Sequence, residues 1–143
     1  MIDAALRDAY LATGYVVTIG MDRIELRIGQ PAPELDRHLA AGSIATAAFV
    51  TAWNPRSERL SEAENLLRGH DLATAVAALG LQALPVVTAA DDPEWIEHGL
   101  LIFDTSEAQA RALGDRFGQN AIVMLELGGA PQLIELVSPG AAS

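Results

Sequence analysis

The sequence predicts an α+β fold in which three to four helices pack on a mixed, largely antiparallel β-sheet. Three observations support this class. Half of the 143 residues are hydrophobic, which suits one core without disulfides or metals. Helical and strand patterns alternate without a strict βαβ rhythm. Paired strand patterns occur towards both ends of the chain. We therefore expect a single globular domain over residues 1–138 and a flexible C-terminal tail over residues 139–143.

The first third of the chain predicts a helix, a hairpin and a second helix. The first helix covers about residues 3–12. Two strands follow at 15–20 and 23–29, and the second alternates apolar and charged residues. Because this period of two leaves one face in water, we place the hairpin near a sheet edge. The segment 31–42 suits a short helix, with Gly42 at its C-terminal end.

The middle of the chain predicts a buried strand and a long helix. Residues 46–53 are apolar nearly throughout, which is typical of a central strand covered on both faces. The S-x-x-E pattern starting at Ser61 is a capping box and predicts a helix that continues to about Leu79. A strand at 81–87 and a polar turn at 88–95 should follow.

The last third predicts one more helix between central strands. Residues 99–104 form an apolar strand pattern. Ser106 opens a second capping signature, and Gly118 ends the helix that it predicts. Strands at 120–127 and 132–137, separated by a glycine-rich turn, should form a terminal hairpin.

Composition excludes several functional classes. The chain has no cysteine, which removes disulfides, thiolate catalysis and sulfur-ligated metal sites. All nine basic residues are arginines, and the formal net charge of −10 disfavours non-specific binding to nucleic acid or to anionic membranes. The N-terminus lacks the basic region of a signal peptide, and no apolar run reaches the roughly 18 residues of a membrane span. We expect a soluble, cytoplasmic protein.

The junction between the strand at 46–53 and the helix at Ser61 concentrates polar chemistry. It offers an amide at Asn54, a guanidinium at Arg56, a hydroxyl at Ser57 and the free N–H groups of a helix start. Such groups suit a carboxylate or a phosphate. The structural alternative is a simple turn with a capping serine and a solvated arginine.

The helix that follows extends this polar region. A rotation of 100° per residue puts Glu62 and Asn65 on the same stripe as apolar residues further along. Polar groups on a core-facing stripe indicate a polar cavity or a satisfied buried network. Arg59 and Arg68 are expected to face solvent, with Glu64 and Arg68 paired at i,i+4.

Two further regions carry polar side chains. Gln119 and Asn120 stand at the start of a predicted central strand, where they could line a site or satisfy helix-end carbonyls. The segment 91–98 contains Glu97 among several acidic residues and favours a solvated turn. No spacing typical of a metal site, a P-loop, a dinucleotide fingerprint or a nucleophile elbow occurs, so we expect no metal and no cofactor.

Several of these blocks resemble one bacterial family. "AAFVTAWNPRS", "LSEAEN", Trp95 and Glu97 before "LLIF", and "RFGQNAIV" are similar to domain of unknown function 3293. The resemblance implies a small bacterial cytosolic protein, and it implies no activity, substrate or cofactor.

Three functions remain open. The first is a binding or sensing module for a small anionic or amide-bearing metabolite, with a ligand site built from the following candidates: Asn54, Arg56, Ser57, Glu62, Asn65, Glu97, Gln119 and Asn120. The second is a hydrolase or transferase in which Glu62 or Glu97 is the general base and Arg56 with Asn54 stabilises an oxyanion. The third is an interaction protein, monomer or homodimer, anchored by Trp53 and Trp95. We prefer the first.

Overall fold

The computed structural model describes residues 2–90 and 96–136. Seven strands form one sheet in the order β2-β1-β4-β5-β3-β6-β7, and every pairing between them is antiparallel. The strands are β1 (Gly14–Ile19), β2 (Asp22–Leu26), β3 (Thr46–Thr51), β4 (Ala83–Ala89), β5 (His98–Phe103), β6 (Ala121–Glu126) and β7 (Gln132–Glu135). The predicted α+β class is confirmed.

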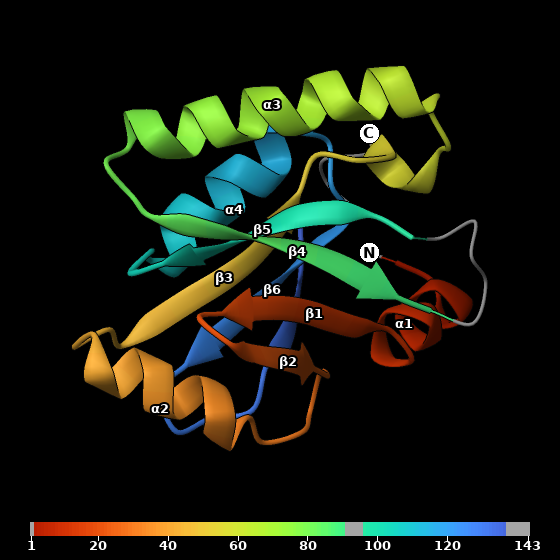
Figure 1. Cartoon of the computed structure of the whole chain (residues 1–143). Helices are drawn as coiled ribbons and strands as arrows, with labels where there is room; N and C mark the ends of the chain where they lie inside the picture. Colours follow the sequence, from red (N-terminus) through yellow and green to blue (C-terminus); the bar gives the residue numbers. More distant parts are fainter. Residues whose placement is uncertain (1, 91–95, 137–143) are drawn as a thin grey trace.

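Helices cover both faces of this sheet (Figure 1). They are α1 (Ala4–Leu11), α2 (Pro33–Ala41), α3 (Glu62–Ala78) and α4 (Glu107–Arg116), with a short 3-10 turn η1 (Pro55–Ser57) between β3 and α3. The predicted capping boxes are both present, at Ser61 with Glu64 and at Ser106 with Gln109. These local hydrogen bonds explain why the two helices begin where the sequence indicates.

Strand alternation divides the core into two parts. On β3, Ala47 and Phe49 point to the face that α2 covers, whereas Ala48 and Val50 point to the face that α3 and α4 cover. Because successive side chains alternate, a fully apolar strand must be central, and β3 lies between β5 and β6.

The hairpins also lie where the sequence places them. β2 is at one edge of the sheet, and β7 pairs with β6 at the other. One expectation needs correction, because β4 extends to Ala89 and includes Thr88, which we expected in a turn. Pairing with both β1 and β5 stabilises β4 there. The segment 91–95 and the predicted tail at 139–143 lie outside the described residues.

Candidate functional site

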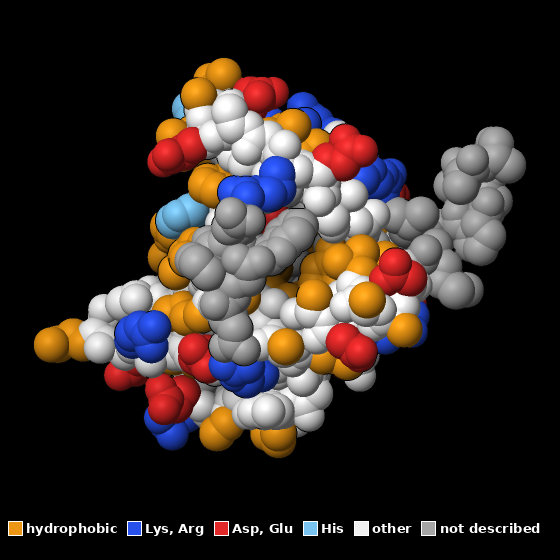
Figure 2. Space-filling view, turned by 90° about the vertical axis from the view of Figure 1, so that its right-hand side faces the viewer, with side chains coloured by type: hydrophobic (Ala, Val, Ile, Leu, Met, Phe, Trp, Pro, Cys, Tyr) orange, Lys and Arg blue, Asp and Glu red, His pale blue; other side chains and the backbone are white. Residues whose placement is uncertain are grey.

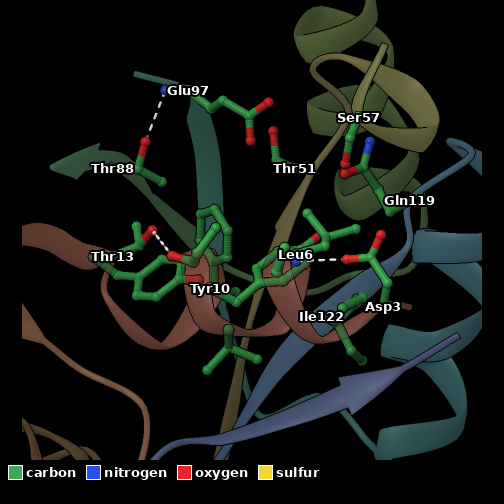
Figure 3. Close-up of a pocket in the computed structure, with 16 residues that line it drawn as sticks. Asp3, Leu6, Tyr10, Thr13, Thr51, Ser57, Thr88, Glu97, Gln119 and Ile122 are labelled. Atoms are coloured by element: carbon green, nitrogen blue, oxygen red, sulfur yellow. Dashed lines mark hydrogen bonds between the residues drawn. The ribbon is translucent and has the colours of Figure 1, made fainter. Parts of the chain in front are cut away.

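A cavity of about 390 Å³ lies between α1 and the sheet. Its walls are mainly apolar, and polar side chains from several elements reach it (Figure 3). The lining consists of Asp3, Ala5, Leu6, Ala9, Tyr10, Thr13, Tyr15, Phe49, Thr51, Ser57, Thr88, Glu97, Gln119, Ala121, Ile122 and Val123. Figure 2 shows the side of the molecule on which α1 lies, with hydrophobic side chains gathered among charged ones of both signs.

The sheet supplies its polar lining at the ends of three adjacent strands. Thr51 follows Phe49 on the same face of β3, and Thr88 follows Val86 on the same face of β4. Glu97 directly precedes β5, whose Gly99 is paired with Thr51 on one side. The core-facing rows of the sheet thus change from apolar to polar where they enter the cavity.

Gly99 shapes the floor of the cavity. A Cβ at this position would lie 2.6 Å from Cε1 of Phe49, so the Phe49 ring occupies the space that a side chain on β5 would fill. The Phe49 ring also packs against Tyr15, with 4.9 Å between the ring centroids. These two aromatic rings form an apolar base below the polar strand ends.

Glu97 is the carboxylate of this sheet wall. Its backbone N–H donates to Oγ1 of Thr88 at 2.8 Å, and its Oε2 accepts from Nδ2 of Asn54 at 2.8 Å. Burial raises the pKa of Glu97 to about 7, although the Asn54 hydrogen bond acts in the opposite direction. A group that exchanges protons near neutral pH thus faces a mainly apolar cavity.

Asn54 holds Glu97 in position through a network in the β3–α3 loop. Its Oδ1 accepts from Nδ2 of Asn65 at 2.8 Å and from the N–H of Leu60 at 3.0 Å. Because two donors meet this oxygen, the amide nitrogen must be the end that points to Glu97. Oδ1 of Asn65 completes the exchange by accepting from the N–H of Asn54 at 2.9 Å.

The loop backbone is unusual over the same residues. Asn54, Arg56 and Ser57 all have positive φ angles, of 47°, 54° and 61°. Such conformations are costly for residues with side chains and persist where the surroundings impose them. Here the N–H of Arg56 donates to the carbonyl of Gly118 at 2.8 Å, which ties the loop to the segment before β6.

Side-chain hydrogen bonds also join the β3–α3 loop to the residues before β6. Nη1 of Arg56 donates to the carbonyl of Gln119 at 2.8 Å, and Nε2 of Gln119 donates to the carbonyl of Trp53 at 3.0 Å. Nδ2 of Asn120 donates to Oγ of Ser57 at 2.9 Å. The two polar regions of the sequence therefore meet in space, and most of their groups bind each other.

The helix α1 provides the opposite wall. Tyr10 lies near Ser57 and Glu97, and burial together with the Glu97 charge raises its pKa to about 12, against a hydrogen bond with Ser57 that lowers it. Asp3 caps α1 by accepting from the N–H of Leu6 at 2.8 Å. Figure 3 shows Leu6 and Tyr10 across the cavity from Thr51 and Glu97.

The predicted site residues thus have three different locations. Ser57, Glu97 and Gln119 line the cavity. Asn54, Asn65 and Asn120 stand behind it and position those that do. Arg56 is exposed and does not line the cavity, and its guanidinium donates to the backbone carbonyl of Gln119. Glu62 is exposed on the first turn of α3 and does not line the cavity.

The expected pairing of Arg68 with Glu64 at the surface is wrong. Nε of Arg68 donates to the carbonyl of Ala52 at 2.6 Å, and its Nη2 donates to the carbonyl of Phe117. Glu64 instead binds Ser61 as part of the capping box. The cause is that the carbonyls of Ala52, just after β3, and of Phe117, at the C-cap of α4, lie beside α3 within reach of a long guanidinium.

Sequence reasoning missed the contribution of α1 and of the strand ends. Tyr10, Thr51 and Thr88 line the cavity but carry no motif. The sequence signal of the two threonines is their position, since each continues the core-facing row of an otherwise apolar strand. Only the strand order shows that these rows end side by side.

The described part of the chain contains neither a cluster of metal-ligating side chains nor a membrane-spanning helix. Residues 2–90 and 96–136 contain no group of three or more acidic or histidine side chains arranged to hold a metal ion. Within the same ranges, none of the helices combines the length and apolar character needed to cross a bilayer. Trp95, one of the two predicted interface anchors, lies outside the described residues, and Trp53 is half-buried against His98.

Comparison with known proteins identifies a family. A family model described as a protein of unknown function, DUF3293, matches residues 50–122. The chain belongs to the DUF3293 family. No curated protein and no solved structure shows a significant match.

The DUF3293 match covers the loop network but not α1. It begins in β3 and ends in β6, so it includes Glu97 and both polar regions that meet in space. The helix that closes the cavity, α1, comes from the part of the chain before the match.

Proposed function

We propose that this DUF3293 protein binds a small, mainly apolar molecule in the cavity beneath α1, with one polar group of the ligand at Glu97. The observation that carries the proposal is a mainly apolar cavity with a largely buried carboxyl group on its wall. Its volume of about 390 Å³ lies within the range of small-molecule sites. The loop network around Asn54 supports this function because it fixes the carboxyl group before a ligand arrives.

The lining modifies the ligand chemistry expected from the sequence. None of the sixteen described residues that line the cavity is Arg, Lys or His, and two of them, Asp3 and Glu97, are acidic. The exposed Arg56, which we expected to hold an anion, instead donates to a carbonyl. An anionic metabolite therefore gains no support from this cavity, whereas an amide-bearing one stays compatible with it.

A ligand screen with a cavity-filling variant tests the proposal. We expect small apolar compounds that carry one hydrogen-bonding group to raise the melting temperature of the wild-type protein. Ala9→Trp should abolish this shift, because Ala9 lines the cavity and a tryptophan there would fill it. The substitution should leave the fold intact, because α1 contains no buried residue. Ala73→Trp, on the exposed face of α3, is the matched control and should preserve the shift.

Two outcomes of this screen would contradict ligand binding in the cavity. One is that no compound of the screen stabilises the wild-type protein. The other is that Ala9→Trp responds to ligand as strongly as Ala73→Trp does, which would place any binding elsewhere on the surface.

A second candidate is acid–base catalysis by Glu97. The observation that favours it is the pKa of about 7, which suits a group that must both accept and release a proton near neutral pH. The other predicted base, Glu62, does not line the cavity. Asn54 acts as a positioning group in this structure, because its side-chain NH2 donates to Glu97 itself and its backbone N–H donates to Asn65.

Catalysis would be tested with ester and amide substrates at several pH values. A hydrolase that depends on Glu97 should show a rate transition near the pKa of this group, and Glu97→Gln should remove the activity. Activity that survives Glu97→Gln would eliminate this candidate. The third function, an interaction module, as well as the monomeric or dimeric state and the cytoplasmic location, remain predictions from the sequence.

A further inference from the structure

We infer that the ligand of the cavity is a primary or secondary alkylamine, bound as its ammonium ion between Glu97 and the ends of the strands. This inference rests on the proposed function and names the ligand class for the same site. It follows from the hydrogen-bonding capacity that the lining residues have left after their contacts with each other.

Two polar groups of the sheet wall, those of Glu97 and Thr51, present acceptors to the cavity. Oε2 of Glu97 accepts from Asn54, and no residue in the described part of the chain donates to Oε1. The hydroxyl proton of Thr51 is committed to the carbonyl of His98 at 2.7 Å. Oγ1 of Thr51 also accepts from the N–H of Trp53 at 3.1 Å, so it has one further lone pair and no donor to offer.

When Glu97 is ionised, a ligand that faces these two groups must therefore supply the hydrogen-bond donors. An ammonium group carries two or three of them and also compensates the charge of a carboxylate. A ligand carboxylate would bring further acceptors and a like charge next to Glu97. An alcohol or ether would supply at most one donor and no charge.

The remaining lining suits the alkyl part of such a ligand. Leu6, Tyr15, Phe49 and Val123 give apolar walls. An aromatic lining also tolerates a nearby cation, because ring faces carry partial negative charge. The formal net charge of −10 favours the approach of cations over that of anions.

The ionisable groups around Glu97 are consistent with a cationic ligand. Asp3 at the N-cap of α1, Tyr10 on α1 and Tyr15 on β1 reach the cavity, whereas no Arg, Lys or His among residues 2–90 and 96–136 lines it. Burial without a positive partner keeps the pKa of Glu97 at about 7, and it raises the pKa of Tyr15 as well. A bound ammonium ion would supply that partner and make Glu97 release its proton.

Calorimetric titration with a matched series of compounds tests the ligand class. Hexylamine, hexan-1-ol, hexanamide and hexanoate each contain six carbon atoms in an unbranched chain and differ in the polar group at its end. Hexylamine should bind most tightly. Its affinity should rise by about tenfold between about pH 6 and about pH 8, because Glu97 loses its proton over this interval.

Two variants assign the effect to Glu97. Glu97→Gln retains an oxygen that accepts from Asn54 but carries no charge, so hexylamine affinity and its pH dependence should both be lost. Glu62→Gln changes an exposed glutamate outside the cavity and should behave as the wild-type protein does. Thermal unfolding of both variants in the absence of ligand checks that each is folded.

The results separate this inference from the proposed function. Tighter binding of hexanamide or hexan-1-ol, with affinity that falls as pH rises, would overturn the amine and retain a ligand-binding cavity in which protonated Glu97 is the donor. Preferential binding of hexanoate would overturn the amine directly. Absence of binding by all four compounds to the wild-type protein would count against the proposed function as well.

Discussion

Two helices, α1 and α2, lie over the same face of the sheet, and they differ in how closely they pack against it. The helix α2 inserts Leu35 and Leu39 into the core, and each is only 1% exposed. The helix α1 contains no buried residue, and a cavity lies between it and the sheet. Figure 1 shows the two helices at different ends of the molecule. One half of this face is therefore a packed core, and the other half contains a cavity.

The side chains of α1 explain the difference. Ala5 and Ala9 face the cavity and are too small to reach the strands, while Leu6 and Tyr10 contribute to its wall. Polar contacts hold the helix instead. Nη2 of Arg7, in the middle of α1, donates to Oε2 of Glu135 at 2.9 Å. A helix rich in alanine can thus cover a face of the sheet without filling the space beneath it.

The largest expected effect tests whether the two halves differ in stability. Leu39→Ala should lower the free energy of unfolding by about 2–5 kcal/mol, because it leaves a void in a packed core. Leu6→Ala, on α1, should cost about 1 kcal/mol or less, because Leu6 is only partly buried and already borders a cavity. Urea unfolding of both variants measures the difference.

Equal losses for the two leucines would break this comparison. They would mean that α1 contributes to the cooperative core as much as α2 does. Ala40→Gly on the exposed side of α2 provides a reference for a change in helix propensity alone, which should cost about 1 kcal/mol.

The second prediction concerns the largely buried carboxyl group of Glu97, which lies in the half of the face that α1 covers. The folded-state pKa of Glu97 is about 7, above the ordinary value of 4.5, so the folded protein binds the proton more tightly than the unfolded chain does. Wild-type stability should therefore decrease as pH rises from about 4.5 to about 7. Glu97→Gln should remove this decrease and be more stable than wild type above pH 7, by up to about 3 kcal/mol.

Unfolding measured at several pH values checks the sign. The informative quantity is the difference between the variant and the wild type, because other carboxylates contribute equally to both. A difference that stays constant from about pH 5 to about pH 8 would show that Glu97 has an ordinary pKa in the folded protein.

Much of the fold could be predicted from the sequence because its signals are local. The capping boxes at Ser61 and Ser106 contain both partners of each hydrogen bond within four residues. The alternation in β2 and the continuous apolar run in β3 indicate their edge and central positions. Local patterns also suggested an ion pair for Arg68, which was wrong because its partners are distant carbonyls.

The candidate site was less predictable because it depends on strand order. The meeting of Asn54 with Asn65 and of Ser57 with Asn120 followed from placing both polar regions at one sheet end. The role of α1 did not follow, because "AALRDAYL" reads as an ordinary short helix. Whether such a helix covers a core or a cavity depends on its distance from the sheet. The periodicity of the sequence does not encode this distance.

The smallest expected effect concerns the contacts that hold α1. Glu135 accepts from the N–H of Ile2 and from Arg7, and these hydrogen bonds lower its pKa. Glu135→Gln should weaken both contacts, so the amides of α1 should exchange with deuterium faster while those of α2 stay unchanged. Glu126→Gln, an exposed glutamate on the neighbouring strand, is the control. If amide exchange in α1 and in α2 responds alike to Glu135→Gln, α1 opens only when the whole domain unfolds. A ligand would then have to enter the cavity by a path that does not require movement of α1.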